Sequence, residues 1–316
     1  MIGLDDVRAA AERIAGQVRR TPVIAADNLK ESLVSVPDVN VVLKLELLQV
    51  TGSFKARGAT NRLLSMDPAM LEKGIVTASG GNHGLATARA GYISGVQTTI
   101  YLPENATPAK IEKLKQWNAD IHIVGSVWDA ANAAALEHVK RTGAAYFHPF
   151  ADREVVAGQG TVALEILDQI PEADVFLVAM GGGGLISGVA TAVKALRPKA
   201  RVIGVEAAGS PVLLRALEAG KNIALDAVTT SVATMACAKT DDRIFEIVRD
   251  KVDEIVLVED DEMLRAARWL WFEMGLAADL SGAAAIAALR EGRVALNSGE
   301  TVCAIVCGAG PEAMAG

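Results

Sequence analysis

This sequence predicts an α/β fold in which a mostly parallel sheet carries helices on both faces. Short runs of β-branched residues alternate with segments of helical periodicity along the 316 residues. Hydrophobic residues make up 51% of the chain but aromatic residues only 4%, so the core is expected to consist mainly of Val, Leu, Ile and Ala. Such a composition is typical of strands that are buried beneath helices on both faces.

The expected elements follow one another as strand, helix, strand along the chain. Ser53 is expected to cap a helix over residues 54–64, and Asp129 to open a helix that stops at Gly143. The predicted strands are residues 41–46, 75–79, 98–102, 121–124, 175–180, 201–206, 254–258 and 301–306. Ligands of such folds bind in the loops that follow the carboxyl ends of the strands.

Charge and cysteine content limit the function and the compartment. A net charge of −7 at pH 7 argues against a nucleic-acid partner, because phosphate backbones attract basic surfaces. No apolar run reaches the roughly 20 residues that a membrane-spanning helix needs, and the N-terminal segment is no signal peptide. Cys237, Cys303 and Cys307 show neither paired nor metal-ligand spacing. We therefore expect a cytoplasmic protein without disulfides or a bound metal.

A lysine at the start of a predicted helix is the first candidate for chemistry. Lys55 follows Phe54 and lies in the first turn of that helix. The positive end of the helix dipole and partial burial both disfavour an ammonium ion, so this lysine could act as a nucleophile or form a Schiff base. A lone lysine at a helix start is more often a surface residue, so the interpretation depends on the surrounding motifs.

A loop of small residues between a predicted strand and a helix is the second candidate. It contains Ser79, Gly81, Asn82 and His83. Small residues let backbone N–H groups converge on an anion such as a carboxylate, and the Asn82 amide can bond a phenolate-like oxygen. A plain strand-to-helix turn would explain the same residues when they are taken alone.

Consecutive glycines after an apolar strand are the third candidate. This loop reads Gly181, Gly182, Gly183, Gly184 and Leu185 and leads into a helix, which is the arrangement of a phosphate-binding loop. A dinucleotide-dependent oxidoreductase is the alternative, because Glu206 ends the next strand where a ribose-binding acid would lie. The dinucleotide fingerprint fails, since Ile186 or Ser187 replaces its third glycine.

The fourth candidate is an apolar strand that ends at Cys307 and continues into small residues up to Gly310. A core strand followed by a turn would give the same pattern, with Cys307 as a small packed side chain. The sequence shows no Ser-His-Asp order, HExxH motif or paired carboxylates that would support hydrolysis.

Together these motifs resemble those of the fold-type II enzymes that use pyridoxal 5′-phosphate (PLP), most closely the threonine dehydratase and serine racemase branch. The resemblance is carried by residues 52–58, 79–84, 158–161 and 181–184. It implies a tryptophan synthase β-like α/β fold with two open, twisted, mostly parallel sheets and helices on both faces. It also implies a large PLP-binding domain over residues 1–65 and 149–316 and a small mobile domain over residues 66–148.

The resemblance implies a role for each motif. Lys55 would carry PLP as a Schiff base, with Phe54 beside the ring and Asn82 at its 3-oxygen. Gly181, Gly182, Gly183, Gly184 and Leu185 would hold the phosphate, and Cys307 would face the pyridine nitrogen. Ser79, Gly81, Asn82 and His83 would receive the substrate carboxylate. Because a thiol is no strong anion at neutral pH, Cys307 would leave the pyridine nitrogen unprotonated, which favours loss of a β-substituent over transamination.

The implied activity is that of a dehydratase (an ammonia-lyase) acting on a β-hydroxy L-amino acid of the threonine, serine or phenylserine type. The products would be a 2-oxo acid and ammonia, formed by α,β-elimination. A racemase needs a second acid/base opposite the lysine, and Gly80 stands where similar racemases carry a serine. Racemisation, β-replacement and a non-catalytic PLP-binding or sensor protein stay as alternatives. The family also implies a homodimer or homotetramer.

Overall fold

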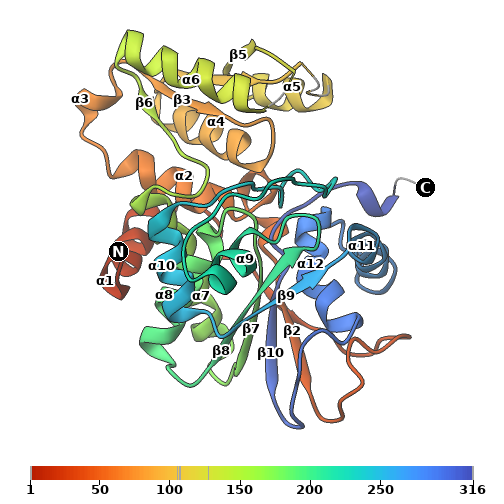
Figure 1. Cartoon of the computed structure of the whole chain (residues 1–316). Helices are drawn as coiled ribbons and strands as arrows, with labels where there is room; N and C mark the ends of the chain where they lie inside the picture. Colours follow the sequence, from red (N-terminus) through yellow and green to blue (C-terminus); the bar gives the residue numbers. More distant parts are fainter. Residues whose placement is uncertain (1, 105, 107, 127, 315–316) are drawn as a thin grey trace.

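The computed structural model describes residues 2–104, 106, 108–126 and 128–314. Its strands form two sheets, one of six strands and one of four, and helices lie against both (Figure 1). This architecture confirms the predicted α/β class with two mostly parallel sheets. The predicted domains also include residues 1, 105, 107, 127, 315 and 316, which lie outside the described residues.

The six-stranded sheet has the order β1-β2-β10-β7-β8-β9. Its strands are β1 (Val23–Ala25), β2 (Asn40–Lys44), β7 (Val175–Ala179), β8 (Arg201–Ala207), β9 (Glu254–Val258) and β10 (Thr301–Ile305). Neighbouring strands run parallel except β1, which is antiparallel to β2. Because β2, β10 and β7 are parallel neighbours, the segments that follow them emerge at one edge of the sheet. These segments lead to Lys55, Cys307 and the glycine loop.

The four-stranded sheet is wholly parallel and has the order β5-β4-β3-β6. Its strands are β3 (Ile75–Ala78), β4 (Thr98–Leu102), β5 (Asp120–Ile123) and β6 (Ala145–Tyr146). All of them lie within the predicted small domain, residues 66–148, and the two boundary positions themselves stay a prediction. The Asn82 loop follows β3 directly.

The helices between the strands cover the two sheets (Figure 1). They are α1 (Leu4–Ile14), α2 (Lys55–Leu64), α3 (Pro68–Leu71), α4 (Asn82–Ser94), α5 (Pro108–Lys115), α6 (Trp128–Thr142), α7 (Arg153–Gln169), α8 (Gly184–Leu196), α9 (Val212–Ala219), α10 (Asp242–Lys251), α11 (Asp260–Met274) and α12 (Leu280–Arg290). Short 3₁₀ turns lie at η1 (Glu46–Leu48), η2 (Val50–Gly52) and η3 (Glu312–Met314). The largest hydrophobic core encloses the six-stranded sheet, and smaller clusters surround the other sheet.

Helix α2, which begins at Lys55, connects the two sheets with their helices, because it packs against both α7, beside the six-stranded sheet, and α4, beside the four-stranded sheet. Glycines permit a close approach to α7. A Cβ atom added at Gly158 would lie 2.7 Å from the carbonyl oxygen of Arg57 and 2.7 Å from the Cα of Gly58. The glycines of the 158–161 motif therefore serve helix packing, and they fix the position of the helix that carries Lys55.

A network of buried charges ties α2 to α7 and β2. Arg57 donates to Glu46 at 2.7 Å and to Glu165 at 2.7 Å, and Lys44 donates to Glu165 at 2.7 Å. Burial lowers the pKa of Lys44, a shift that the hydrogen bond and charge of Glu165 oppose. Two cations and two carboxylates balance in this network, so no net charge is buried.

The predicted strands match the observed ones to within two residues at each end, and both ends coincide for residues 98–102 and 254–258. The strands β1 and β6 were not predicted, because three and two residues are too short to show a period. The helix expected from Asp129 begins one residue earlier, at Trp128, and ends at Thr142 before Gly143.

Candidate active site

Lys55 is the first residue of α2, and its amine points into the protein. The side chain is half-buried, and Nζ donates a hydrogen bond to the carbonyl oxygen of Pro149 at 2.7 Å. Burial lowers the pKa of this amine to about 8, although the thiols of Cys307 and Cys237 oppose the shift. A substantial neutral fraction near neutral pH makes the amine a usable nucleophile and base.

The prediction that Ser53 caps this helix is wrong. Phe54 occupies the N-cap position and makes no side-chain capping bond. Ser53 has an extended backbone and pairs with Gly308 in an isolated bridge, so it lies one residue too early to cap α2. Its buried hydroxyl has no hydrogen-bond partner among the described residues.

The segment before Lys55 is fastened to the segment that contains Cys307. The N–H of Phe54 donates to the carbonyl of Cys307 at 3.2 Å, and the N–H of Ala309 donates to the carbonyl of Gly52 at 2.8 Å. Thr51 has φ of 62°, an uncommon left-handed conformation for a residue with a side chain. These contacts place Lys55 and Cys307 at one site, although they are far apart in the sequence.

The four-glycine loop opens α8 and lies against Phe150. A Cβ atom at Gly182 would lie 2.3 Å from the Phe150 ring, and Gly183 has φ of +86°, so both positions require glycine. The hydroxyl of Thr240 donates to the carbonyl of Gly182 at 2.9 Å. Gly184 and Leu185 are the first residues of α8, and the first N–H groups of a helix have no partner within it. The adjacent Pro149 and Phe150 connect this loop to the Lys55 amine.

The loop after β3 brings Asn82 to the site and holds the His83 ring against the backbone of Phe147. Asn82 begins α4, and its Nδ2 donates to Asp279 at 3.0 Å. The His83 ring is buried, with Nε2 3.1 Å from the carbonyl oxygen of Phe147. Burial, and then the charge of Lys55, lower the pKa of His83 to about 3, so the ring is neutral. Ser79 and Gly81 of the same loop are half-buried, and the binding of a carboxylate by this loop stays a prediction.

Cys307 is buried at the end of β10 and stays a thiol. Burial, and then the negative charge of Asp279, raise its pKa well above the ordinary value. Its Sγ lies 3.9 Å from the hydroxyl of Ser281, to which it donates. A protonated thiol can donate a hydrogen bond but cannot supply a negative charge to a neighbouring ring nitrogen.

Several residues at the site were missed in the sequence. They are Pro149, Thr240, Asp279 and Ser281. Asp279 is the N-cap of α12, and Asp followed three residues later by Gly reads as an ordinary cap. The local sequence does not show whether a capping aspartate also bonds a residue from a distant part of the chain, as Asp279 does with Asn82.

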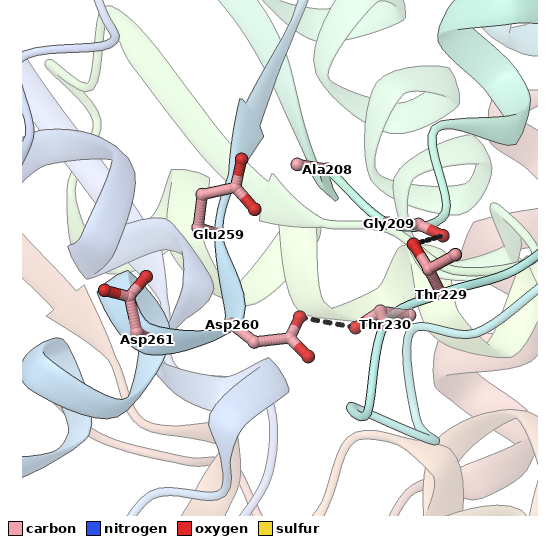
Figure 2. Close-up of a pocket in the computed structure, with 7 residues that line it drawn as sticks. All are labelled: Ala208, Gly209, Thr229, Thr230, Glu259, Asp260 and Asp261. Atoms are coloured by element: carbon pink, nitrogen blue, oxygen red, sulfur yellow. Dashed lines mark hydrogen bonds between the residues drawn. The ribbon is translucent and has the colours of Figure 1, made fainter.

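A separate hollow lies away from Lys55, at the carboxyl ends of β8 and β9. Its volume is about 470 Å³, and Figure 2 shows the side chains that line it, Ala208, Gly209, Thr229, Thr230, Glu259, Asp260 and Asp261. Asp260 accepts hydrogen bonds from Thr230 and Ser231, so its charge is already compensated. Across the described residues we find no cluster of three His, Cys, Asp or Glu side chains that could hold a metal. Nor does any helix in those residues have the length and apolar character to cross a membrane.

The fold and the site define an α/β enzyme with a desolvated lysine amine beside a glycine-rich helix start. A family model described as "Pyridoxal-phosphate dependent enzyme" matches residues 14–308. The chain therefore belongs to this family, and its cofactor is PLP.

Similar proteins include lyases and racemases. An L-threonine ammonia-lyase of Geobacter sulfurreducens is 38% identical over 299 residues, which cover 95% of this chain and 73% of that protein. A serine racemase of Arabidopsis thaliana is 35% identical over 288 residues, which cover 90% of this chain and 84% of that protein. The structure of maize serine racemase aligns with a TM-score of 0.91 at 33% identity, over 97% of this chain and 93% of that one. The processed form of threonine deaminase isoform 2 from Solanum lycopersicum aligns with a TM-score of 0.89 at 32% identity, over 97% of this chain and 83% of that one.

The residues present fit PLP. The buried hydroxyl of Ser53, which has no partner in the described part of the chain, and the free amides at the start of α8 provide hydrogen-bond donors for an anion. The Lys55 amine, with its lowered pKa, suits covalent attachment to an aldehyde. Because Gly182 carries no side chain, its backbone can lie directly against Phe150.

Proposed function

We propose that this protein is a PLP-dependent ammonia-lyase that converts a β-hydroxy L-amino acid of the threonine or serine type to a 2-oxo acid and ammonia by α,β-elimination. The observation that carries the proposal is the position of the Lys55 amine, which donates to Pro149 beside the four-glycine loop and whose pKa burial lowers to about 8. An amine of this kind can attach the cofactor and also take a proton from a bound substrate. The names of the similar proteins, L-threonine ammonia-lyase and threonine deaminase, support the same reaction.

Each part of the site has a proposed role in holding the cofactor. Gly181, Gly182, Gly183, Gly184 and Leu185 would bind its phosphate through backbone N–H groups. Phe54 would pack beside the ring, whose 3-oxygen and pyridine nitrogen would face Asn82 and Cys307. When bound, PLP supplies an electron sink that stabilises negative charge at the substrate Cα.

The remaining steps belong to side chains and backbone of this chain. The loop of Ser79, Gly81, Asn82 and His83 would hold the substrate carboxylate through N–H groups, hydroxyl and amide. Lys55 Nζ would then take the proton from the substrate Cα as the general base, and the β-hydroxyl group would leave as water, so that the substrate loses one H⁺ and one OH⁻ in all. Water would hydrolyse the released enamine to the 2-oxo acid and ammonia. The thiol of Cys307, which supplies no negative charge, supports rapid loss of the hydroxyl group over transamination.

The test is a direct assay of products. Purified protein is incubated with L-threonine, L-serine or L-phenylserine, and ammonia and 2-oxo acid are measured. We expect equal amounts of both products from threonine or serine, and turnover of phenylserine would extend the substrate range to an aromatic β-substituent. Protein that binds PLP but releases no ammonia from any of the three would refute the lyase and favour a sensor protein. A clear preference for 3-hydroxyaspartate would contradict a substrate of the threonine or serine type.

Racemisation is the second candidate, because serine racemases are among the similar proteins. Against it stands Gly80, which offers no side chain as a second acid/base. A Cβ atom at Gly80 would lie 3.1 Å from Leu102 Cδ2, so a small side chain needs only a slight shift of Leu102. We expect Gly80→Ser to form D-serine from L-serine several times faster than the wild type. Gly80→Ala, which adds the same Cβ without a hydroxyl, should not. Substantial D-serine from the wild type would make racemisation the better function.

The assembly and the compartment are further parts of the proposal. A homodimer or homotetramer is supported by exposed apolar side chains on α11, where Trp271 is 45% and Phe272 69% exposed. Light scattering coupled to gel filtration would measure the mass directly, and a monomer would contradict the assembly. A cytoplasmic location is supported by the free thiols of Cys237, Cys303 and Cys307. The small-molecule partner would be the amino-acid substrate.

A further inference from the structure

The carboxylate of Asp279 is buried where three segments of the chain meet. It is 7% exposed and caps α12 by accepting from the N–H of Gly282 at 2.6 Å. Glycines of the fourth sequence motif make room for it. A Cβ atom at Gly308 would lie 2.5 Å from Oδ2, and one at Gly310 would lie 2.7 Å from the Asp279 Cβ. The small residues after Cys307 are thus required by a carboxylate of this chain.

The two oxygens of Asp279 have different partners. Oδ1 accepts from the Ser281 hydroxyl at 2.7 Å as well as from Gly282, and Oδ2 accepts from Asn82 Nδ2 at 3.0 Å. Asn82 begins α4 beside the four-stranded sheet, whereas Asp279 and Ser281 belong to the α12 end of the six-stranded layer. Asp279 therefore joins the two parts of the fold through a hydrogen bond of a buried group, and loss of this bond would leave a buried oxygen without a partner.

The same hydrogen bonds continue to Cys307. The Ser281 hydroxyl, which donates to Asp279, accepts from Cys307 Sγ at 3.9 Å. A continuous chain runs from Asn82 through Asp279 and Ser281 to Cys307. Both oxygens of Asp279 accept in this chain, since Asn82, Ser281 and Gly282 are the donors. Asp279 therefore faces the NH₂ end of the Asn82 amide, and the second N–H of that NH₂ group is left for another acceptor.

We propose that Asp279 is a positioning residue that orients both Asn82 and, through Ser281, Cys307. The inference rests on the proposed function only in so far as these two side chains are taken to face opposite edges of the PLP ring. The carboxylate of Asp279 would then orient both side chains that contact the ring, Asn82 beside the four-stranded sheet and Cys307 beside the six-stranded sheet. A change at Asp279 would therefore alter both contacts at once.

The experiment compares the holoenzyme with two variants of this hydrogen-bond chain. Asp279→Asn keeps Oδ1 for Ser281 and Gly282, and asparagine caps a helix as well as aspartate does. It places an NH₂ group opposite the NH₂ group of Asn82, so Asn82 can keep this bond only by turning its amide over, and the orientation that Asp279 imposes is lost. Ser281→Ala breaks the connection to Cys307 and leaves Asn82 bonded to Asp279.

We expect Asp279→Asn to raise the dissociation constant of PLP about tenfold, because the Asn82 amide is no longer held in its orientation, and to shift the visible absorbance and fluorescence of bound PLP. The melting temperature of the apoprotein should change little. Ser281→Ala should shift the spectra with a smaller effect on affinity. Asp67→Asn, the same exchange at the N-cap of α3, is the control and should leave both readouts unchanged.

Wild-type affinity and spectra in Asp279→Asn would overturn the proposal. A lower melting temperature with unchanged spectra would do so as well, because it assigns Asp279 a structural role alone. Unchanged spectra in Ser281→Ala would remove Cys307 from the chain of contacts. Titration of PLP needs no turnover, so a wild type that binds PLP but releases no ammonia would refute the proposed lyase and still leave this comparison decisive.

Discussion

Two lysines, Lys44 and Lys55, lie close together in the sequence and differ in what surrounds their amines. Lys44 donates to the Thr21 carbonyl at 2.8 Å, to Glu165 at 2.7 Å and to Gln169 at 2.8 Å. Lys55 donates to the Pro149 carbonyl at 2.7 Å and, among the described residues, has no carboxylate partner. Burial lowers the pKa of both amines. The difference teaches that burial alone does not make a lysine reactive; free hydrogen-bonding capacity on the nitrogen is also needed.

The largest expected effect is on activity, and it would separate the two lysines. Lys55→Ala removes the amine that is proposed to hold the cofactor and to take the Cα proton. We expect ammonia release to fall at least about a thousandfold. The rate per folded protein is measured with threonine as substrate. Residual activity within tenfold of the wild type would show that the Lys55 amine is not needed for the reaction, and the contrast with Lys44 would no longer hold.

The second expected effect is on stability. Lys44→Met leaves the carboxylates Glu46 and Glu165 with Arg57 as their cation, so one net negative charge is buried. We expect the free energy of unfolding to fall by about 3 kcal/mol, measured by urea denaturation. Folded protein should still bind PLP. Lys194→Met is the matched control, because Lys194 pairs with Asp253 nearer the surface and should cost less than about 1 kcal/mol.

The third expected effect is a dependence of stability on pH. The pKa of Lys55 is about 8 in the folded protein and about 10.5 in an unfolded chain, so the unfolded chain binds more protons between these values. The free energy of unfolding of the apoprotein, relative to that of Lys55→Met, should therefore rise with pH over this range by on the order of 3 kcal/mol. This gain is lost again as the pH falls through 8. Urea denaturation of both proteins at several pH values measures it. A difference independent of pH would mean that the amine is not desolvated.

The smallest expected effect concerns the polar partners of Lys44. Gln169→Leu removes one acceptor of the Lys44 amine while two others remain. We expect a loss of about 1 kcal/mol in the free energy of unfolding, with PLP affinity unchanged. Gln17→Leu on the surface controls for the exchange itself. A change in PLP affinity would show that the charge network is coupled to the reactive lysine.

The sequence predicted the fold because the signals of its strands are local: runs of β-branched residues marked them. Lys55 was predicted to be the reactive lysine from Phe54 and the neighbouring glycines, and this role stays a prediction. Lys44 alternates with apolar residues as an exposed charge on an edge strand would, so its burial was not predictable. Its partners come from α7, over a hundred residues away in the chain. Compensation of a buried charge by such distant residues depends on the tertiary structure, so the local sequence does not reveal it.

The same reasoning explains which parts of the site were missed. The glycines after Cys307 suggested a ligand loop, whereas they accommodate Asp279. A glycine in a sequence can indicate that another group lies close to the backbone, but it does not indicate whether that group is a ligand or a side chain of the protein. His83 was predicted with the carboxylate-binding loop, and helix α4 turns its ring toward Phe147. The direction of a side chain at the start of a helix follows from the helix, which the motif alone does not specify.

The most direct test is chemical mapping of the lysine that holds PLP. The holoenzyme is reduced with borohydride and digested, and its peptides are weighed by mass spectrometry. We predict one pyridoxyl group per chain, on the peptide that contains Lys55. A pyridoxyl group on Lys44 or on any other lysine, with Lys55 unmodified, would contradict the central claim that the desolvated amine of Lys55 is the reactive one.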